Sequence, residues 1–277
     1  MTHILVLKST GEQEVFVPAK LILSLRKAGA SDSEANRIAD HIQKELVNGI
    51  PTSEIYKHAF EILRQDAKPV AARYSMKRAI ADLGPSGFPF EKLIAEIFKA
   101  KGYEAVTGQI IEGNCVEHEV DVVAWKGDKL SIIEAKFHNE PGLKSDLKVA
   151  LYIRARFDDL KNSVHEYGGK KRKVTSFQLF TNTKFTDHAI RYAECQGLSL
   201  VGWNYPAEGN LEDLINEAKL HPLTSLLTLT QTEKKSLLDA GMILCKHLLE
   251  HKDKLADYGI EKGKIDTVIE EVINVCK

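Results

Sequence analysis

The chain has 277 residues, 43% of them hydrophobic and 28% charged, which excludes the disordered, collagen-like and disulfide-stapled classes of protein. Its 38 lysines and arginines nearly balance 39 aspartates and glutamates, so the net charge of −1 does not by itself indicate a nucleic-acid or membrane partner. Any such site must be local, and at roughly 150 residues per domain the length predicts two or three domains.

The four cysteines stand alone in the sequence, at Cys115, Cys195, Cys245 and Cys276. Without a CxxC pair they predict neither a cysteine zinc cluster nor a disulfide framework. The first residues are too short an apolar run for a signal peptide, and no run of about 18 apolar residues is free of charge. We therefore expect a soluble, cytoplasmic protein that does not enter a membrane.

The N-terminal part of the chain should be a hairpin followed by helices. Two short β-branched runs, at residues 3–8 and 14–17, lie on either side of Gly11 and predict two strands joined by a turn. Four helices should follow, beginning at Pro18, at Ser31 with a capping box to Glu34, at a cap on Thr52 or Ser53, and after Pro69. A linker at residues 84–87 then ends this region, because Gly-Pro-Ser-Gly cannot continue a helix.

The middle of the chain predicts a mixed sheet with helices on both faces, because one helix and three consecutive strands precede an alternation of helix and strand. The predicted helices lie near 90–101, 145–166 and 184–196, and the strands at 103–111, 115–125, 129–137, 174–180 and 198–203. From about residue 210 only short helices are expected. The predicted domains are therefore 1–84, 85–209 and 210–277.

The segment Lys129–Phe137 is the strongest candidate for a catalytic site. Because side chains alternate along a strand, Glu134 and Lys136 should share one face. The turn at 126–129 should fold the preceding strand back and bring Asp121 opposite Glu134. Like charges in that position are unfavourable without a counter-ion, and a divalent metal held by Asp121 and Glu134 would supply one.

Such a site suits the hydrolysis of a phosphodiester. Two carboxylates can hold Mg²⁺, which prefers hard oxygen ligands and withdraws charge from phosphoryl oxygens. Lys136 could orient or help to deprotonate the attacking water and stabilise charge in the transition state. Glu91, at the start of the preceding helix, is a further candidate acid. The alternative is an exposed hairpin with an incidental Asp, Glu and Lys.

These residues resemble a known signature. Asp121 and Glu134-Ala135-Lys136, preceded by Phe90–Ile94, are similar to the D…(D/E)xK motif of the restriction-endonuclease-like (PD-(D/E)xK) fold, and more narrowly to its Mrr-type branch, associated with type IV restriction of modified DNA. The resemblance covers about residues 86–206. It implies an α/β nuclease domain, DNA as substrate, and catalysis by Glu91, Asp121, Glu134 and Lys136 with Mg²⁺. The family often has Gly before Val-Asp, where this chain has His118-Glu119.

The N-terminal region resembles the ATP cone, the regulatory nucleotide-binding domain of ribonucleotide reductases and of a repressor of their genes. The similar segments are Val6–Lys8, Gly11, Glu14–Phe16, Lys20–Ile22 and Ile50–Ile55, and the match spans about residues 2–84. It implies a mainly helical domain with a β-hairpin that binds ATP or dATP. The family pattern usually has Arg after the first Lys, where this chain has Ser9.

The nucleotide site of such a cone would combine lysines with apolar side chains. Lys8 and Lys20 would supply point charges to the phosphates, and an apolar set would cover the adenine. The expected nucleotide-binding residues are Val6, Lys8, Glu14, Lys20, Ile22, Thr52 and Ile55. The chain has no Gly-x-x-x-x-Gly-Lys-Ser/Thr motif, so ATP would be an effector and not a fuel.

Two further stretches could meet DNA. Between Lys144 and Lys173 there are nine lysines and arginines against four acidic residues, which could face phosphates or form a solvated loop. Residues 237–248 resemble a helix-hairpin-helix element, although a helical bundle that docks subunits is an equal alternative.

These observations together predict a Mg²⁺-dependent DNA endonuclease regulated by ATP, with a homo-oligomer, a dimer, as the expected assembly. The main alternative is a non-catalytic, nucleotide-sensing DNA-binding or regulatory protein, which would have no need of Asp121, Glu134 and Lys136 together. A third possibility is an ATP-responsive assembly module in which both domains are scaffolds.

Overall fold

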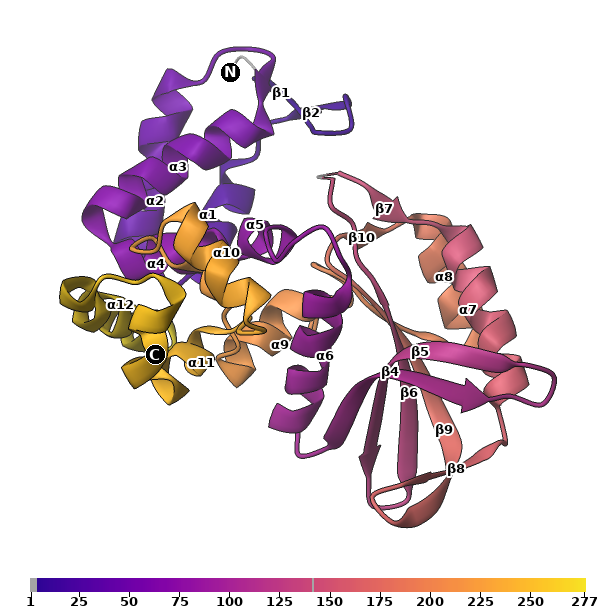
Figure 1. Cartoon of the computed structure of the whole chain (residues 1–277). Helices are drawn as coiled ribbons and strands as arrows, with labels where there is room; N and C mark the ends of the chain where they lie inside the picture. The colour runs from indigo at the N-terminus through magenta and orange to yellow at the C-terminus, as the bar shows by residue number, and fades with distance from the viewer. Residues whose placement is uncertain (1–3, 141) are drawn as a thin grey trace. The chain divides into compact units, whose positions relative to one another are not determined.

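The computed structural model describes residues 4–140 and 142–277, which form two compact units (Figure 1). The first unit contains the described residues up to Ala79 together with His221–Leu237 and Cys245–Lys277, and the second contains Ile80–Leu220 and Leu238–Leu244. Among the described residues, no helix is long and apolar enough to cross a membrane.

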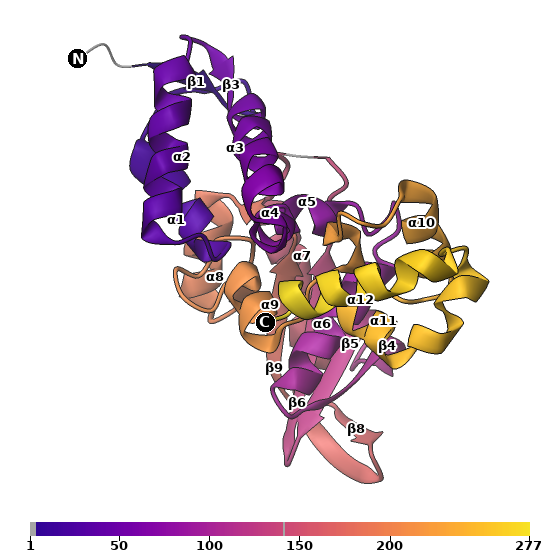
Figure 2. The ribbon, with the colours of Figure 1, turned by 90° about the vertical axis from the view of Figure 1, so that its left-hand side faces the viewer.

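The first unit begins with the predicted hairpin. Strand β1 (Leu5–Leu7) pairs antiparallel with β2 (Gln13–Val15) and parallel with β3 (Ile50–Pro51), so β1 is central. His3, at the start of the predicted first strand, lies outside the described residues. Figure 2 shows β1 and β3 at one end of helices α2 and α3.

Five helices follow: α1 (Pro18–Lys27), α2 (Asp32–Glu45), α3 (Thr52–Asp66), α4 (Lys68–Tyr74) and α5 (Met76–Ala81). The predicted capping box of α2 is confirmed, since Ser31 and Glu34 each accept a hydrogen bond from the other's backbone N–H. The predicted cap of α3 is wrong, because the N-cap is Pro51 and no side chain caps the helix. Pairing of Pro51 with β1 brings the strand up to the helix, so Thr52 is already its first residue.

The predicted fourth helix is divided in two at Ser75. The Ser75 hydroxyl donates a 2.8 Å hydrogen bond to the carbonyl of Ala72, and Ser75 is the C-cap of α4. Serine competes for backbone partners in this way, which disfavours it inside helices.

The core of the first unit lies between the helices. Buried apolar residues recur at helical spacing on the inner faces of α1, α2 and α3, namely Leu21, Leu25, Ala35, Ile38, Ala39, Ile42, Ile55, Ala59 and Leu63. The C-terminal elements are η1 (Leu223–Ser225), α10 (Gln231–Asp239), α11 (Cys245–Glu250), η2 (Lys252–Tyr258) and α12 (Lys262–Val275). Leu227, between η1 and α10, packs against this core.

Arg73 of α4 joins the N-terminal and C-terminal parts of the first unit. Its Nε donates to the Ala28 carbonyl at 2.8 Å, and its Nη1 donates to the Asn274 carbonyl at 3.1 Å. Both acceptors lie at helix C-termini, where a cation is favourable. Gly29 (φ +90°) makes room for it, because an added Cβ would stand 2.8 Å from Arg73 Nη2.

The second unit contains the predicted mixed sheet, with strand order β11-β9-β6-β5-β4. The strands are β4 (Glu104–Glu112), β5 (Glu117–Lys126), β6 (Lys129–Lys136), β8 (Val164–Tyr167), β9 (Lys170–Thr181) and β11 (Ser199–Val201), with β8 paired to β9. Strand β5 pairs antiparallel with both β4 and β6, whereas β9 pairs parallel with both β6 and β11.

Helices cover both faces of this sheet, as predicted (Figure 1). The helices are α6 (Phe88–Ala100), α7 (Leu147–Leu160), α8 (Asp187–Gln196) and α9 (Leu211–Ala218). One core joins α7 and α8 to the strands, with Ile153 and Ala189 packed among Val120, Ile132 and Leu179. On the other side α6 contributes Phe90 and Phe98, which contact Phe137 and Phe180.

The predicted end of the 145–166 helix, at residue 166, is wrong. Helix α7 ends at Leu160, and a hairpin of β8 and β9 follows, with Tyr167 opposite Lys170. The two residues between them, Gly168 and Gly169, have φ of +57° and +70°, which the tight two-residue hairpin turn requires and glycine readily adopts. Similarly, α8 begins at Asp187, because Lys184–Phe185 form β10, paired with β7 (Lys144–Ser145).

Candidate active site

The hairpin of β5 and β6 brings Asp121 to the end of β6, as the sequence predicts. The strands pair with Val122 opposite Ile133, so Asp121 and Glu134 come next along the two strands. Asp121 Oδ2 accepts a 2.7 Å hydrogen bond from the backbone N–H of Ala135, between Glu134 and Lys136. The aspartate is thereby fixed beside the Glu-Ala-Lys segment.

The two carboxylates of this hairpin are held in a poorly solvated place. Burial raises the pKa of Asp121, although the Ala135 N–H and the charge of Arg156 oppose the rise. Burial and the neighbouring charge of Asp121 raise the pKa of Glu134 to about 7. A site with this electrostatic cost favours a cation.

Glu91 lies in the first turn of α6 and takes part in the same electrostatic cluster. Burial is the main cause that raises its pKa to about 7, and the charges of Asp121 and Glu119 add to it. The structure therefore brings Glu91 near the hairpin carboxylates, where the sequence expected it. Three acidic groups near one another, two of them with pKa values near 7, are typical of a functional site.

Arg156 of α7 is the site residue that the sequence did not predict. Its Nη1 donates to Glu134 Oε2 at 2.7 Å, and its Nη2 donates to the Glu119 carbonyl. The arginine is 8% exposed, and its buried Nε has no hydrogen-bond partner. It supplies the only positive charge bonded to Glu134 among the described residues.

The signal for Arg156 is present in the sequence, in the spacing of α7. The buried residues of this helix are Ala150, Ile153, Arg156 and Leu160, which lie on one face at steps of three and four. An arginine in an apolar stripe must have a partner, since buried charges are paired. Arg156 also belongs to the basic stretch 144–173, where its charge alone does not distinguish it from the other lysines and arginines.

Lys136 stands at the exposed end of β6, opposite Thr181 of β9. The chain beyond it is fixed by Asn182, whose Oδ1 accepts from the His138 N–H and whose Nδ2 donates to the His138 carbonyl, both at 2.8 Å. Buried Ser145 bonds both the His138 ring and the Thr181 hydroxyl. The strand end that carries Lys136 is therefore rigidly placed.

The donor set fits a divalent metal. Asp121 uses one oxygen for the Ala135 N–H, and Glu134 uses one for Arg156, so each carboxylate keeps a second oxygen that could bind a metal. Hard carboxylate oxygens and clustered negative charge suit Mg²⁺. Glu91, Asp121 and Glu134 are all among the described residues, but their carboxylate oxygens do not all lie within 4.8 Å of one another.

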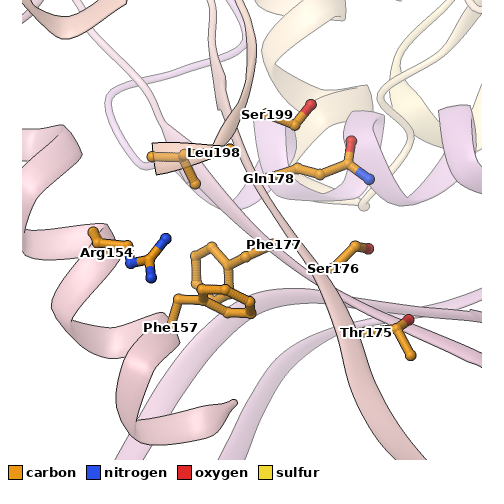
Figure 3. A pocket seen from close by; sticks show the side chains of 9 residues that line it. Arg154, Phe157, Thr175, Ser176, Phe177, Gln178, Leu198 and Ser199 are labelled. Carbon is orange, nitrogen blue, oxygen red and sulfur yellow. The ribbon is translucent and has the colours of Figure 1, made fainter. Parts of the chain in front are cut away.

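A pocket of about 230 Å³ lies elsewhere in the second unit, between α7, β9 and β11 (Figure 3). Arg154, Phe157 and Gln178 line it together with Thr175–Phe177 and Gly197–Ser199. None of the candidate catalytic carboxylates is among these residues, so the hollow is separate from the acidic site.

The polar residues expected to bind nucleotide meet in the first unit. Lys8 Nζ lies 2.9 Å from Glu14 Oε2, and Lys20 Nζ lies 3.2 Å from the same oxygen. The hydrogen bond from Lys8 lowers the pKa of Glu14, and the bond to Glu14 raises that of Lys8. Two lysines therefore share one carboxylate on an exposed surface, with the charge of Glu12 also acting on Lys8.

The apolar residues expected around the adenine are placed differently. Val6 and Ile55 are only 2% and 7% exposed and belong to the core, while Ile22 packs against that core and stays partly exposed. Thr52, at the start of α3, is also partly exposed. Among these four residues, Ile22 and Thr52 offer the more accessible surface.

The last four basic residues of the 144–173 stretch, Lys170–Lys173, begin β9 in the β8–β9 hairpin, and the others lie in or next to β7 and α7. Lys170, Lys171 and Lys173 are exposed, whereas Arg172 donates to the carbonyls of Gly127, Tyr167 and Lys170. Arg172 therefore holds the hairpin together. Lys171 and Lys173 could face an anion directly, and Lys170 could do so in exchange for its present partner, Asp128.

Comparison with protein families gives three matches. The ATP cone domain matches residues 4–83, the restriction endonuclease family, of the Mrr catalytic type, matches residues 84–204, and the C-terminal region of AF1548-like proteins matches residues 221–276. The two resemblances and the fold class predicted from sequence are thus confirmed.

A curated sequence and a solved structure each match the larger part of the chain. An uncharacterized protein of Archaeoglobus fulgidus is 36% identical over 183 residues, which are 66% of this chain and 99% of that protein. The crystal structure of AF1548, a protein of unknown function, is 34% identical with a TM-score of 0.55, and the match covers 69% of this chain and 98% of that one. The chain therefore belongs to the AF1548-like family, and it carries an ATP cone domain followed by an Mrr-type restriction endonuclease domain.

Proposed function

We propose that the protein is a Mg²⁺-dependent DNA endonuclease, of the kind that acts in type IV restriction, whose activity responds to ATP or dATP. The observation that carries this proposal is the Asp121 side chain bonded to the Ala135 N–H, between Glu134 and Lys136. This arrangement supplies two carboxylates and one ammonium at a single strand end, within a domain of the restriction endonuclease family.

The chain's own groups have distinct roles in this proposal. Asp121 and Glu134 hold the metal, which when bound withdraws charge from the phosphoryl oxygens and activates water. Lys136 orients the attacking water and stabilises negative charge in the transition state. Glu91, with a pKa of about 7, can hold or release a proton near neutral pH.

The direct test is incubation of plasmid DNA with the full chain. Supercoiled DNA should be converted to nicked and linear forms with Mg²⁺ and remain intact with a chelator, and ATP or dATP should change the rate. Methylated and unmethylated plasmids compared side by side would show whether modification is needed. No cleavage of either plasmid with Mg²⁺ or Mn²⁺ would contradict the proposal.

The stability of the protein and its response to Mg²⁺ should both depend on pH through Glu134. Its folded-state pKa of about 7 lies above the ordinary 4.5, so the folded state holds a proton that the unfolded chain releases. Without metal, stability should therefore fall as pH rises from about 5 to 8. Mg²⁺ needs the carboxylate, so its rise in melting temperature should be larger at pH 8 than at pH 6.

Scanning calorimetry at these two pH values, with Mg²⁺ and with a chelator, measures both effects. Glu134→Gln should weaken the pH dependence and the Mg²⁺ response together. An equal Mg²⁺ shift at both pH values would mean that Glu134 is not a ligand.

The β8–β9 hairpin should contribute to DNA affinity. Replacing Lys170, Lys171 and Lys173 with Ala should weaken binding to all sequences alike, and the slope of log K against log salt should flatten by about 0.9 for each lost phosphate contact. Fluorescence anisotropy with a short duplex in EDTA measures this slope. Alanine replacement of the exposed Lys44, Lys57 and Lys68 is the matched control. A slope unchanged from wild type would make the hairpin a solvated element only.

ATP or dATP should stabilise the first unit through Lys8 and Lys20. A ligand that binds only the folded state adds about 2.7 kcal/mol at 100 times its dissociation constant. The double variant Lys8→Ala, Lys20→Ala should lose this gain, because Glu14 is then left to repel the triphosphate. Thermal unfolding of the full chain with millimolar ATP measures the shift, and Lys44→Ala with Lys57→Ala should retain it.

The alternative, a non-catalytic nucleotide-sensing DNA-binding protein, is favoured by one observation. Arg156 already neutralises Glu134 at 2.7 Å, so the carboxylate pair can persist without a metal. The plasmid assay separates the two functions, since a regulator would bind DNA without cutting it. Three other points stay predictions: the division of the chain at 84/85 and 209/210, the helix-hairpin-helix role of the tail, and a homodimer.

A further inference from the structure

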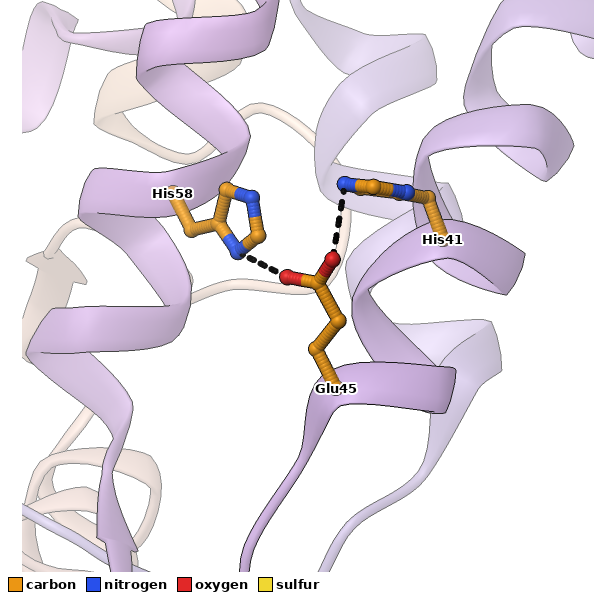
Figure 4. Close-up of side chains that lie close together, drawn as sticks. All are labelled: His41, Glu45 and His58. Carbon is orange, nitrogen blue, oxygen red and sulfur yellow. Dashed lines mark ion pairs between the residues drawn. The ribbon is translucent and has the colours of Figure 1, made fainter.

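A cluster of metal-binding side chain types lies in the first unit, apart from the residues assigned above (Figure 4). His41 and Glu45 come from α2, and His58 comes from α3. Their candidate ligand atoms all lie within 4.8 Å of one another, and among residues 4–140 and 142–277 no other three His, Cys, Asp or Glu side chains meet this condition.

The two helices place these side chains for simple reasons. His41 and Glu45 are four residues apart and so share one face of α2. The inner faces of α2 and α3 pack through Ile42 and Ala59, each one residue away from a member of the cluster. The cluster therefore lies at the solvent edge of a fixed helix pair, with the His41, Glu45 and His58 side chains 50%, 53% and 37% exposed.

The distances within the cluster favour an ion. Glu45 Oε1 lies 3.4 Å from His41 Nε2, and Glu45 Oε2 lies 3.5 Å from His58 Nδ1. These separations exceed the 2.7–3.2 Å of ordinary N–H···O hydrogen bonds. With metal–ligand bonds of about 2.0–2.1 Å, however, neighbouring ligands of a tetrahedral zinc lie about 3.3 Å apart. The two distances run to different oxygens of Glu45, so the carboxylate stands between the imidazoles (Figure 4), and one ligand atom from each of the three side chains lies within 4.8 Å of the others.

We propose that His41, Glu45 and His58 bind a divalent transition metal of the zinc type, with solvent completing the coordination. Imidazole nitrogen suits Zn²⁺, Ni²⁺ and Co²⁺, whereas Mg²⁺ takes oxygen ligands, so this site and the acidic site of the second unit select different ions. Two histidines and one glutamate leave a fourth position for water.

The bound metal would join the end of α2 to the middle of α3. The segment that it brackets, residues 46–57, contains β3 and both Thr52 and Ile55. A metal that binds only the folded arrangement stabilises the first unit by mass action.

The test is metal binding to the full chain without a polyhistidine tag, after treatment with a chelator. Dialysis against ZnCl₂ should leave one more equivalent of zinc on wild type than on His41→Ala or His58→Ala, since any zinc at the acidic site is common to all three proteins. With CoCl₂, wild type should show visible d–d absorption that both variants lack. Zinc should also raise the melting temperature of wild type.

Two variants keep this test decisive. His188→Ala removes an exposed histidine from α8 and should bind zinc as wild type does. Glu45→Gln keeps a similar shape and should weaken zinc binding about tenfold or more. Circular dichroism in chelator should show wild type and all four variants equally folded. Equal zinc content in wild type and the two cluster histidine variants, or none in wild type, would overturn the proposal.

Discussion

Asp121→Asn and Lys136→Ala should each reduce Mg²⁺-dependent DNA cleavage by about 10³-fold or more, while the fold and DNA binding persist. The asparagine keeps an oxygen for the Ala135 N–H but removes the charge that a metal ligand needs. The alanine removes the ammonium that stabilises negative charge in the transition state. Single-turnover cleavage of plasmid measures both losses separately from binding.

Matched controls lie in the same hairpin. Asp128→Asn changes an exposed aspartate in the turn between β5 and β6, whose partner is Lys170 and not the acidic site, so it is compared at saturating protein. Lys129→Ala changes an exposed lysine at the other end of β6. Both should cut as wild type does. Wild-type cleavage by Asp121→Asn or by Lys136→Ala would remove that residue from the site.

Arg156→Met should destabilise the folded protein more at pH 8 than at pH 5. Glu134 would lose its counter-charge in a poorly solvated position, and with a pKa of about 7 it could take up a proton at pH 8 at a cost of about 1.4 kcal/mol, which sets the charge-dependent part of the loss. The loss should be smaller at pH 5, because Glu134, with a pKa of about 7, is then protonated and needs no partner. Urea unfolding at the two pH values measures the difference.

Two further variants identify the cause of that loss. Arg154→Met, two residues earlier on α7, breaks an ion pair to the exposed Asp158 and should cost less than about 1 kcal/mol through that pair. Adding Glu134→Gln to Arg156→Met should recover much of the stability, because the unpaired charge is gone. A loss that is the same at pH 5 and pH 8 would assign it to packing and not to charge.

Local patterns in the sequence predicted most of the fold. The strand–turn–strand pattern around Lys126–Lys129 placed Asp121 beside β6, because the register of a short hairpin follows from its turn. Ser31 and Glu34 gave the start of α2, since a capping box uses only neighbouring residues. The family resemblances on the ATP cone and nuclease motifs were also sufficient to name both domains.

Contacts between distant segments could not be read in the same way. Arg156 meets Glu134 only because α7 packs on the sheet, and the pairing depends on tertiary structure instead of spacing along one element. Pro51 pairs with Leu7, which shifted the start of α3 away from the expected cap. His41 and His58 come together through packing of α2 on α3, so no local motif announces their cluster.

The order in which the first unit is assembled has a consequence for synthesis of the protein. Arg73 needs the Asn274 carbonyl, and the N-terminal core packs against Leu227, yet residues 80–220 are translated in between. At ~5–20 residues per second this imposes a delay on the order of ten seconds. During that interval the nascent N-terminal helices lack part of their native cover and should be a substrate for ribosome-associated chaperones.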